Sequence, residues 1–171
     1  FWLNFDEGHF FPGGGRSREE DQTNFALKQL AWDITVGRKV FGDLSAAMSA
    51  PILVVNDYNT MVRILRNLLR QLDLNHVEEA NDGDSAYHMM LKSPPDLIIS
   101  DWNMEPMSGF EFLKLVRTNE TTKALPFIMV TAESKTENII AAKQAGVSNY
   151  IVKPFNAVTL KQKLEAVFGA F

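Results

Sequence analysis

The sequence contains no cysteine among its 171 residues. This absence excludes disulfide bonds, thiolate metal sites and cysteine nucleophiles together, and it fits a reducing compartment. No apolar run approaches the roughly 20 residues that span a bilayer, and the first residues lack the basic start and apolar core of a signal peptide. We therefore expect a cytoplasmic protein with no membrane partner.

An excess of positive charge is also lacking, since the formal net charge is −4 at pH 7. A protein that binds nucleic acid usually presents a basic face to the phosphates, so we expect no nucleic-acid partner. The composition is otherwise ordinary for a globular chain, with 46% hydrophobic residues. This length has room for one full domain and a short appendage.

The composition changes near residue 50, which divides the chain into residues 1–50 and 51–171. In the first part, Pro12 is followed by three glycines, which break any regular element and predict a linker. Apolar residues at helical spacing then predict a short helix over 23–36. We interpret residues 1–50 as an N-terminal extension, either an upstream segment or one of cloning origin. A helix that docks on the main domain is favoured over a partner-binding or dimerising arm.

From residue 51 onward, strand patterns and helical patterns alternate five times. Apolar runs predict strands at 52–55, 76–80, 96–100, 126–130 and 149–152. Helical periodicity predicts helices at 61–72, with Asn59 as N-cap, and at 84–91, 110–117, 136–145 and 157–168. Five βα units with short connections predict an α/β fold, a (βα)5 three-layer sandwich in which helices cover both faces of a parallel five-stranded sheet.

Polar residues stand where four of the predicted strands end. Asn56 and Asp57 follow the first strand, Asp101 the third, Thr131 the fourth and Lys153 the fifth. In a flavodoxin-like sheet with strand order 2-1-3-4-5, these carboxyl ends share one edge, where ligands bind at the topological switch point. A single polar residue at a strand end more commonly caps a helix or forms a turn. Four such ends along one edge instead predict a binding site.

The residue types at this edge suit phosphoryl transfer. Two nearby carboxylates, Asp57 and Asp101, are costly to ionise together without a cation, and oxygen ligands favour magnesium (Mg²⁺). The hydroxyl of Thr131 and the ammonium of Lys153 suit a transferring phosphoryl group beside that metal. Because a carboxylate can itself be the nucleophile, we interpret Asp101 as the phosphoryl acceptor.

Several segments together resemble the motifs of response-regulator receiver domains. They are Val54-Val55-Asn56-Asp57, Ile99-Ser100-Asp101-Trp102-Asn103-Met104, Met129-Val130-Thr131-Ala132-Glu133 and Val152-Lys153-Pro154-Phe155. The resemblance covers residues 51–171 but not 1–50, and residues 138–142 extend it towards the single-domain chemotaxis regulators of that family. Residues 51–171 are thus identified as a receiver domain.

The resemblance implies a phosphorylation-activated switch of a two-component system. Asp101 would accept a phosphoryl group from a histidine kinase. Asp57, Asp101 and the backbone carbonyl of Asn103 would bind Mg²⁺, and Asn56 would contribute through a water molecule. Lys153 would contact the phosphate, and its peptide bond to Pro154 is expected to be cis.

The resemblance also implies how the signal would leave the site. Thr131 would move towards the phosphoryl group and let Tyr150 rotate inward, which would reshape the face formed by the fourth helix, fifth strand and fifth helix. The expected partners are the kinase, a flagellar motor switch protein and a phosphatase, in control of chemotaxis. The chain would not be an enzyme, apart from promoting its own phosphorylation and dephosphorylation.

Three alternatives remain open at this stage. The chain could be a single-domain receiver in a phosphorelay or in kinase regulation, or an inactive receiver that only binds a partner. It could also be a haloacid-dehalogenase-like phosphatase, but the Asp-x-Asp pattern that such enzymes carry after strand one is absent from Asn56-Asp57-Tyr58-Asn59.

Two positions depart from the receiver pattern. An acidic pair usually follows strand one, but its first member here is Asn56. We expect weaker Mg²⁺ binding rather than loss of function. In addition, Glu105 stands where the family usually has proline, with Pro106 displaced by one residue. This displacement alters the loop after Asp101 and could bring Glu105 towards the metal.

Overall fold

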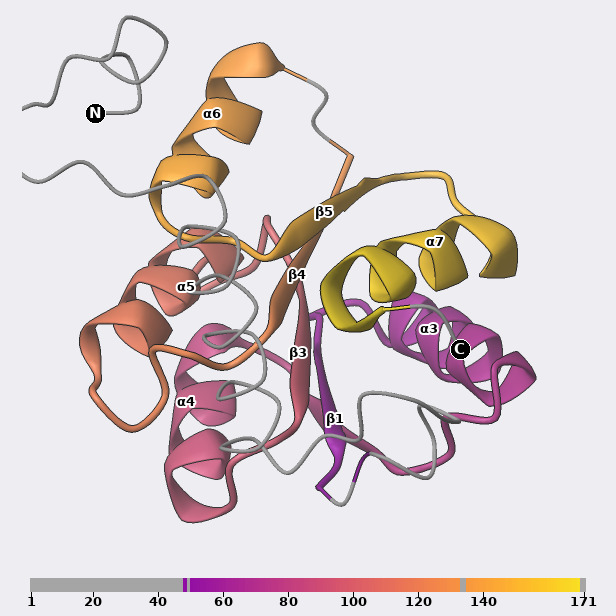
Figure 1. Cartoon of the computed structure of the whole chain (residues 1–171). Helices are drawn as coiled ribbons and strands as arrows, with labels where there is room; N and C mark the ends of the chain where they lie inside the picture. The colour runs from indigo at the N-terminus through magenta and orange to yellow at the C-terminus, as the bar shows by residue number, and fades with distance from the viewer. Residues whose placement is uncertain (1–47, 49, 133–134, 170–171) are drawn as a thin grey trace, which may run out of the picture. The chain divides into compact units, whose positions relative to one another are not determined.

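A computed structural model describes residues 48, 50–132 and 135–169 of the chain (Figure 1). The predicted linker at 12–15 and the predicted helix over 23–36 lie outside the described residues, so both stay predictions. Two residues just upstream of the predicted domain start contact it. Met48 packs against the core, and the Ala50 N–H donates to the Asp96 carboxylate at 2.8 Å.

Strands and helices alternate along the described residues as the sequence predicts. The strands are β1 (Ile52–Val55), β2 (Val77–Ala80), β3 (Leu97–Asp101), β4 (Phe127–Thr131) and β5 (Asn149–Val152). The helices are α3 (Asn59–Gln71), α4 (Gly83–Lys92), α5 (Gly109–Thr118), α6 (Thr136–Gln144) and α7 (Ala157–Phe168). The predicted bounds of the last strand and last helix are confirmed to the residue.

The prediction that Asn59 caps the first of these helices is wrong. Tyr58 is the N-cap, with an extended backbone and no side-chain cap hydrogen bond, and Asn59 is already helical. The physical reason lies upstream. The Tyr58 N–H donates to Asn56 Oδ1 at 2.8 Å, and this local turn directs the chain into α3.

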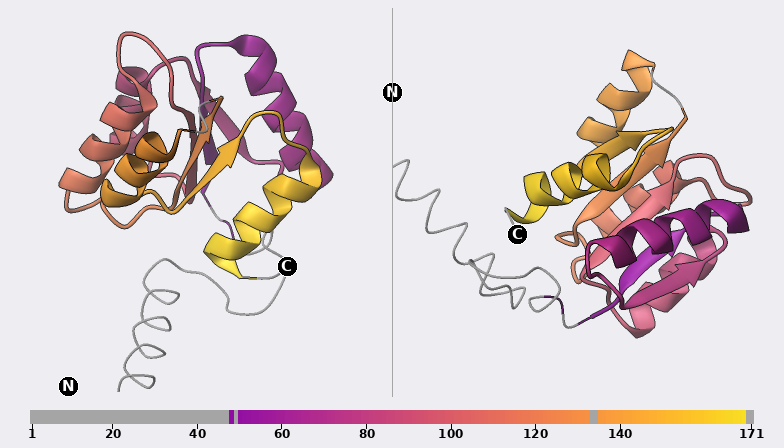
Figure 2. Two further views of the ribbon diagram at one scale, coloured as in Figure 1. Left: turned by 90° about the horizontal axis from the view of Figure 1, so that it is seen from above. Right: turned by 90° about the vertical axis from the view of Figure 1, so that its right-hand side faces the viewer.

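The five strands form one parallel sheet in the order β2-β1-β3-β4-β5. This flavodoxin-like order and the two helical layers confirm the predicted (βα)5 sandwich. Figures 1 and 2 show α3 and α7 on one face of the sheet and α4, α5 and α6 on the other.

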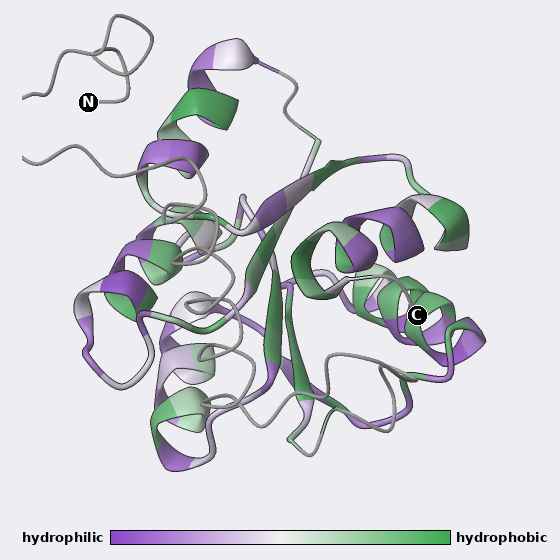
Figure 3. Cartoon of the chain, viewed as in Figure 1, coloured by the Kyte–Doolittle hydropathy of each residue, from purple (hydrophilic) through white to green (hydrophobic). Residues whose placement is uncertain are grey.

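Successive residues of the central strands face opposite helical layers. Ile52 and Val54 of β1 belong to the core beneath α3 and α7, whereas Leu53 and Val55 belong to the core beneath α4 and α5. Figure 3 shows hydrophobic residues along the strands and hydrophilic residues on the outer helical surfaces. Burial of one leucine, isoleucine or phenylalanine side chain contributes about 1.5–3 kcal/mol. The two hydrophobic cores therefore stabilise the strands. The polar residues at the carboxyl edge of the sheet are not needed for this packing and can form a site.

Candidate functional site at the carboxyl edge of the sheet

The sheet register aligns the polar strand ends that the sequence singles out. Val55 of β1 pairs with Ser100 of β3, so the next residues along each strand, Asn56 and Asp101, are neighbours. On the other side of β3, Asp101 pairs with Val130, the residue before Thr131. The register between β4 and β5 then places Lys153 one position beyond the pair of Thr131 and Val152.

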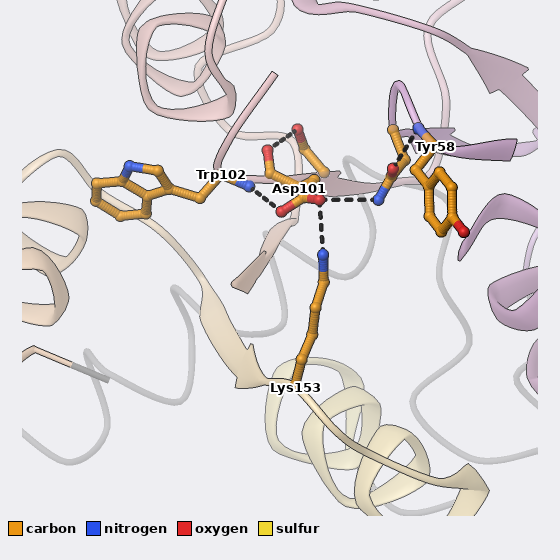
Figure 4. Close-up of polar contacts among 6 residues, drawn as sticks. Tyr58, Asp101, Trp102 and Lys153 are labelled. Carbon is orange, nitrogen blue, oxygen red and sulfur yellow. Dashed lines mark hydrogen bonds and ion pairs between the residues drawn. The ribbon is translucent and has the colours of Figure 1, made fainter. Parts of the chain in front are cut away.

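The Asp101 carboxylate is held by three hydrogen-bond donors (Figure 4). Lys153 Nζ lies 2.7 Å from Oδ2, and Asn56 Nδ2 donates to the same oxygen at 3.1 Å. The Trp102 backbone N–H donates to Oδ1 at 2.7 Å. Asp101 is buried, with 6% of its surface exposed. A buried carboxylate needs such partners, and here an ammonium, an amide and a backbone N–H provide them.

Lys153 is positioned by the strand that precedes it. Its backbone N–H donates to the Thr131 carbonyl oxygen at 2.8 Å, which extends the ladder between β4 and β5 by one residue. The peptide bond to Pro154 is cis, which confirms that prediction. From this position the Lys153 side chain reaches back to Asp101, as Figure 4 shows. Thr131 itself is buried at the end of β4.

Gly109, the first residue of α5, lies against the backbone of the carboxylate-bearing residue. A Cβ at position 109 would be 1.8 Å from the Asp101 carbonyl oxygen and 2.9 Å from Ser100 Oγ. The Gly109 N–H donates to the Trp102 carbonyl oxygen at 2.9 Å. Only glycine fits this approach, so α5 begins directly behind the site. Glycine at the start of a predicted helix was the one sequence signal for this contact.

Trp102 links the site to the neighbouring surface. Its indole stacks on the Phe110 ring, with centroids 5.0 Å apart and 10° between the planes, and Lys114 Nζ lies 4.5 Å from the centre of the Phe110 ring. Trp102 also lines a small, mainly apolar hollow between β4, β5 and α6. The other lining residues are Met129, Thr131, Asn138, Ile139, Ala142 and Tyr150.

Tyr150 lies half-buried at the wall of this hollow. Lys163 Nζ of α7 lies 5.2 Å from the centre of its ring. The two residues named as a switch, Thr131 and Tyr150, therefore line one hollow beside the Asp101 site.

The residues that would hold a metal ion offer oxygen ligands but little charge. Asp57 follows Asn56 and is exposed, as are Asn103 and Glu105. Among residues 48, 50–132 and 135–169, no three acidic, histidine or cysteine side chains group as a metal site. Two carboxylates with a backbone carbonyl still suit Mg²⁺, which keeps several waters and needs only one or two carboxylates. The residues thus fit Mg²⁺ with one carboxylate fewer than an acidic pair would supply.

The family model for the response regulator receiver domain matches residues 52–165. The chain belongs to this family. It is 52% identical over 117 residues to the chemotaxis protein CheY-3 of Vibrio cholerae serotype O1, a match that covers 68% of this chain and 90% of that protein. It is 49% identical over 117 residues to the chemotaxis protein CheY of Pseudomonas aeruginosa, covering 68% of this chain and 94% of that protein.

Solved structures of receiver domains share the fold. The chemotaxis response regulator CheY4 of Vibrio cholerae aligns with a TM-score of 0.64 at 37% identity, covering 69% of this chain and 98% of that one. The signal receiver domain of a signal transduction histidine kinase from Syntrophus aciditrophicus aligns with a TM-score of 0.64 at 25% identity, covering 70% and 90% of the two chains. Like other receiver domains, this chain is therefore a signalling protein of a two-component system.

No helix among the residues that the structure describes is long and apolar enough to cross a membrane. The cytoplasmic location expected from the sequence stays a prediction.

Proposed function

We propose that this receiver domain is a phosphorylation-activated switch whose phosphoryl acceptor is Asp101. The observation that carries the proposal is the convergence of Lys153 Nζ and Asn56 Nδ2 on one oxygen of a buried carboxylate, at 2.7 and 3.1 Å. Groups that stabilise the negative charge of a carboxylate can also stabilise the charge of a phosphoryl group as it transfers.

The transfer itself needs little from the protein beyond position and charge. The phosphorus–nitrogen bond of a phosphohistidine breaks, its electron pair stays with the nitrogen, and an oxygen of Asp101 forms the new bond to phosphorus. Lys153 then pairs with the phosphoryl oxygens as a point charge. Mg²⁺, held by Asp57, Asp101 and the Asn103 carbonyl, would supply further positive charge when bound. Loss of the phosphoryl group to water reverses the signal.

The hollow beside the site supports a route for the signal. Thr131 ends β4 next to the acceptor, and both Thr131 and Tyr150 line the same hollow. A shift of Thr131 towards the phosphoryl group would leave room for the Tyr150 ring to move inward. Such a movement would change the surface of α6, β5 and α7 that a partner contacts.

The partners follow from the family and its relatives. A histidine kinase is the phosphodonor that a two-component receiver implies. The CheY relatives favour chemotaxis, with a flagellar motor switch protein as target and a phosphatase that ends the signal. A role in a phosphorelay or in kinase regulation is the second candidate, favoured by the likeness to a receiver domain of a histidine kinase.

Incubation of the 171-residue chain with acetyl phosphate and excess Mg²⁺ tests the proposal. We expect the mass of one phosphoryl group to appear on the wild type, on the peptide that contains Asp101, and to be absent from Asp101→Asn. Asp84→Asn, an exposed change on α4, is the matched control and should label normally. Labelling of Asp101→Asn at the wild-type rate would refute the assignment. Rapid turnover of many phosphate esters would favour the phosphatase, and no labelling of the wild type would favour an inactive receiver.

A pull-down with the beryllofluoride-treated chain separates the two candidate roles. Capture of a motor switch protein would support chemotaxis, whereas capture of kinase or phosphotransfer components alone would favour the phosphorelay.

A further inference from the structure

The side chain of Asn56 is oriented with its amide nitrogen towards the Asp101 carboxylate. Its Oδ1 accepts the Tyr58 backbone N–H at 2.8 Å, and its Nδ2 donates to Asp101 Oδ2 at 3.1 Å (Figure 4). The backbone N–H can only donate and the carboxylate can only accept, so both ends require the same orientation of the amide. Asn56 is also fully buried, which leaves its side chain little room to turn.

An aspartate at this position would have the opposite effect. One of its oxygens could accept the Tyr58 N–H, but the other would face the Asp101 carboxylate. Two such carboxylates repel each other unless a cation lies between them. Asn56 replaces that repulsion with a hydrogen bond, so both oxygens of the Asp101 carboxylate have protein donors without a metal.

These donors are also placed to bind a phosphoryl group. Asn56 follows β1 and Lys153 follows β5, and both contact the same oxygen of Asp101 from the ends of different strands. A phosphoryl group on Asp101 adds three strong acceptor oxygens close to that oxygen. The Asn56 amide can donate to them, whereas an aspartate would repel them.

We propose that Asn56 is a phosphoryl-binding residue, whose amide replaces part of the charge that a metal ion supplies at this site. The inference rests on the proposed function of Asp101. Its consequence is that binding of a phosphoryl group, or of an anion that mimics one, depends less on Mg²⁺ in this chain than in the same chain with an acidic residue at position 56.

Beryllofluoride binding by the full chain, followed by fluorine NMR with and without Mg²⁺, tests this inference. In magnesium-depleted buffer we expect the wild type to bind beryllofluoride, and Asn56→Ala to bind it about tenfold or more weakly, as expected for loss of one hydrogen bond to a charged group. Asn56→Asp should lose metal-free binding and regain it at high Mg²⁺. Asn67→Asp adds the same charge on the exposed side of α3 and should behave as the wild type.

A second measurement does not depend on how well the variants fold. In the wild type, the side-chain amide resonances of Asn56 should shift when beryllofluoride binds without Mg²⁺. Equal metal-free affinity of the wild type and a folded Asn56→Ala would overturn the inference. So would a wild type that binds beryllofluoride only with Mg²⁺. In either case, normal labelling of Asp101 by acetyl phosphate at excess Mg²⁺ would leave the proposed function standing, and failure of that labelling would refute it separately.

Discussion

Lys153 Nζ and Asp101 Oδ2 lie 2.7 Å apart although the two residues are 52 positions apart in the chain. The pair is largely enclosed, with side-chain exposures of 22% for Lys153 and 8% for Asp101. Removal of one member of an enclosed ion pair leaves the other charge without its main partner, which costs more than loss of a surface pair. The Lys153–Asp101 ion pair therefore contributes to the stability of the fold as well as to the candidate site.

Replacement of Lys153 by methionine should lower stability and slow phosphorylation. Asp101 would keep only the donors Asn56 and Trp102, so we expect a loss of about 1–3 kcal/mol in the free energy of unfolding. Urea unfolding of both single variants and of Asp101→Asn/Lys153→Met completes a double-mutant cycle. A coupling energy indistinguishable from zero would show that the ion pair does not stabilise the fold.

Replacement of Gly109 by alanine should disturb the site through its backbone. The new Cβ would overlap the Asp101 carbonyl oxygen, 1.8 Å away, and backbone atoms cannot move aside as a flexible side chain can. We expect a loss on the order of 3 kcal/mol and slower labelling by acetyl phosphate. Gly83→Ala is the comparison, since its Cβ would meet the Met107 side chain at 2.9 Å and Phe112 Cβ at 3.0 Å but no backbone atom among its three nearest neighbours. If both variants unfold at the same urea concentration, the close approach is not what requires glycine.

The stability of the first turn of α5 should decrease at acid pH. The backbone N–H and the hydroxyl of Ser108 donate to Glu111 at 2.9 and 2.8 Å, and these bonds lower the pKa of Glu111 below its usual 4.5. Because the pKa is lower in the folded chain, the stabilisation is present above the unfolded pKa and is lost as pH falls through the folded value.

Removal of the Ser108 hydroxyl tests this capping box. Ser108→Ala should raise the pKa of Glu111 towards its usual value and cost about 1 kcal/mol of stability, as for other N-cap losses. Carbon-detected NMR titration of the Glu111 carboxyl measures the first, and thermal unfolding near neutral pH the second. Asp82→Ala removes the N-cap of α4 and should destabilise without moving the pKa of Glu111. An unchanged pKa in Ser108→Ala would contradict the role of the hydroxyl.

The convergence of the polar residues at the carboxyl edge of the sheet was predictable from the sequence, because it depends on the pattern of strands. Apolar runs that end in Asn56, Asp101, Thr131 and Lys153 need only a parallel sheet in the 2-1-3-4-5 order to converge, and the register of β1, β3, β4 and β5 brings them together.

Finer features were not predictable because they depend on the exact backbone path of the loops. The direction of the Asn56 amide is set by the backbone N–H of Tyr58, which also explains why Asn59 is not the cap of α3. The stack of Trp102 on Phe110 requires the turn between β3 and α5 to bring the two rings together. The spacing of residue types in the sequence predicts neither contact.

Replacement of Lys163 by methionine should change the position that the Tyr150 ring prefers. The Lys163 ammonium lies 5.2 Å from the centre of the Tyr150 ring, and such a cation–π contact at a partly exposed site contributes about 0.5–1 kcal/mol. Its loss should therefore change the ratio of inward to outward rings about two- to fivefold. Fluorine NMR of the chain labelled with 3-fluorotyrosine, with Tyr150→Phe to assign the signal, measures this ratio at partial saturation with beryllofluoride.

Lys161→Met is the control for this prediction. It removes the same charge two residues away on α7, where Lys161 pairs with Glu165, and should leave the ratio unchanged. If both variants shift the Tyr150 signal alike, the general charge of α7, rather than contact with Lys163, determines the position of the ring.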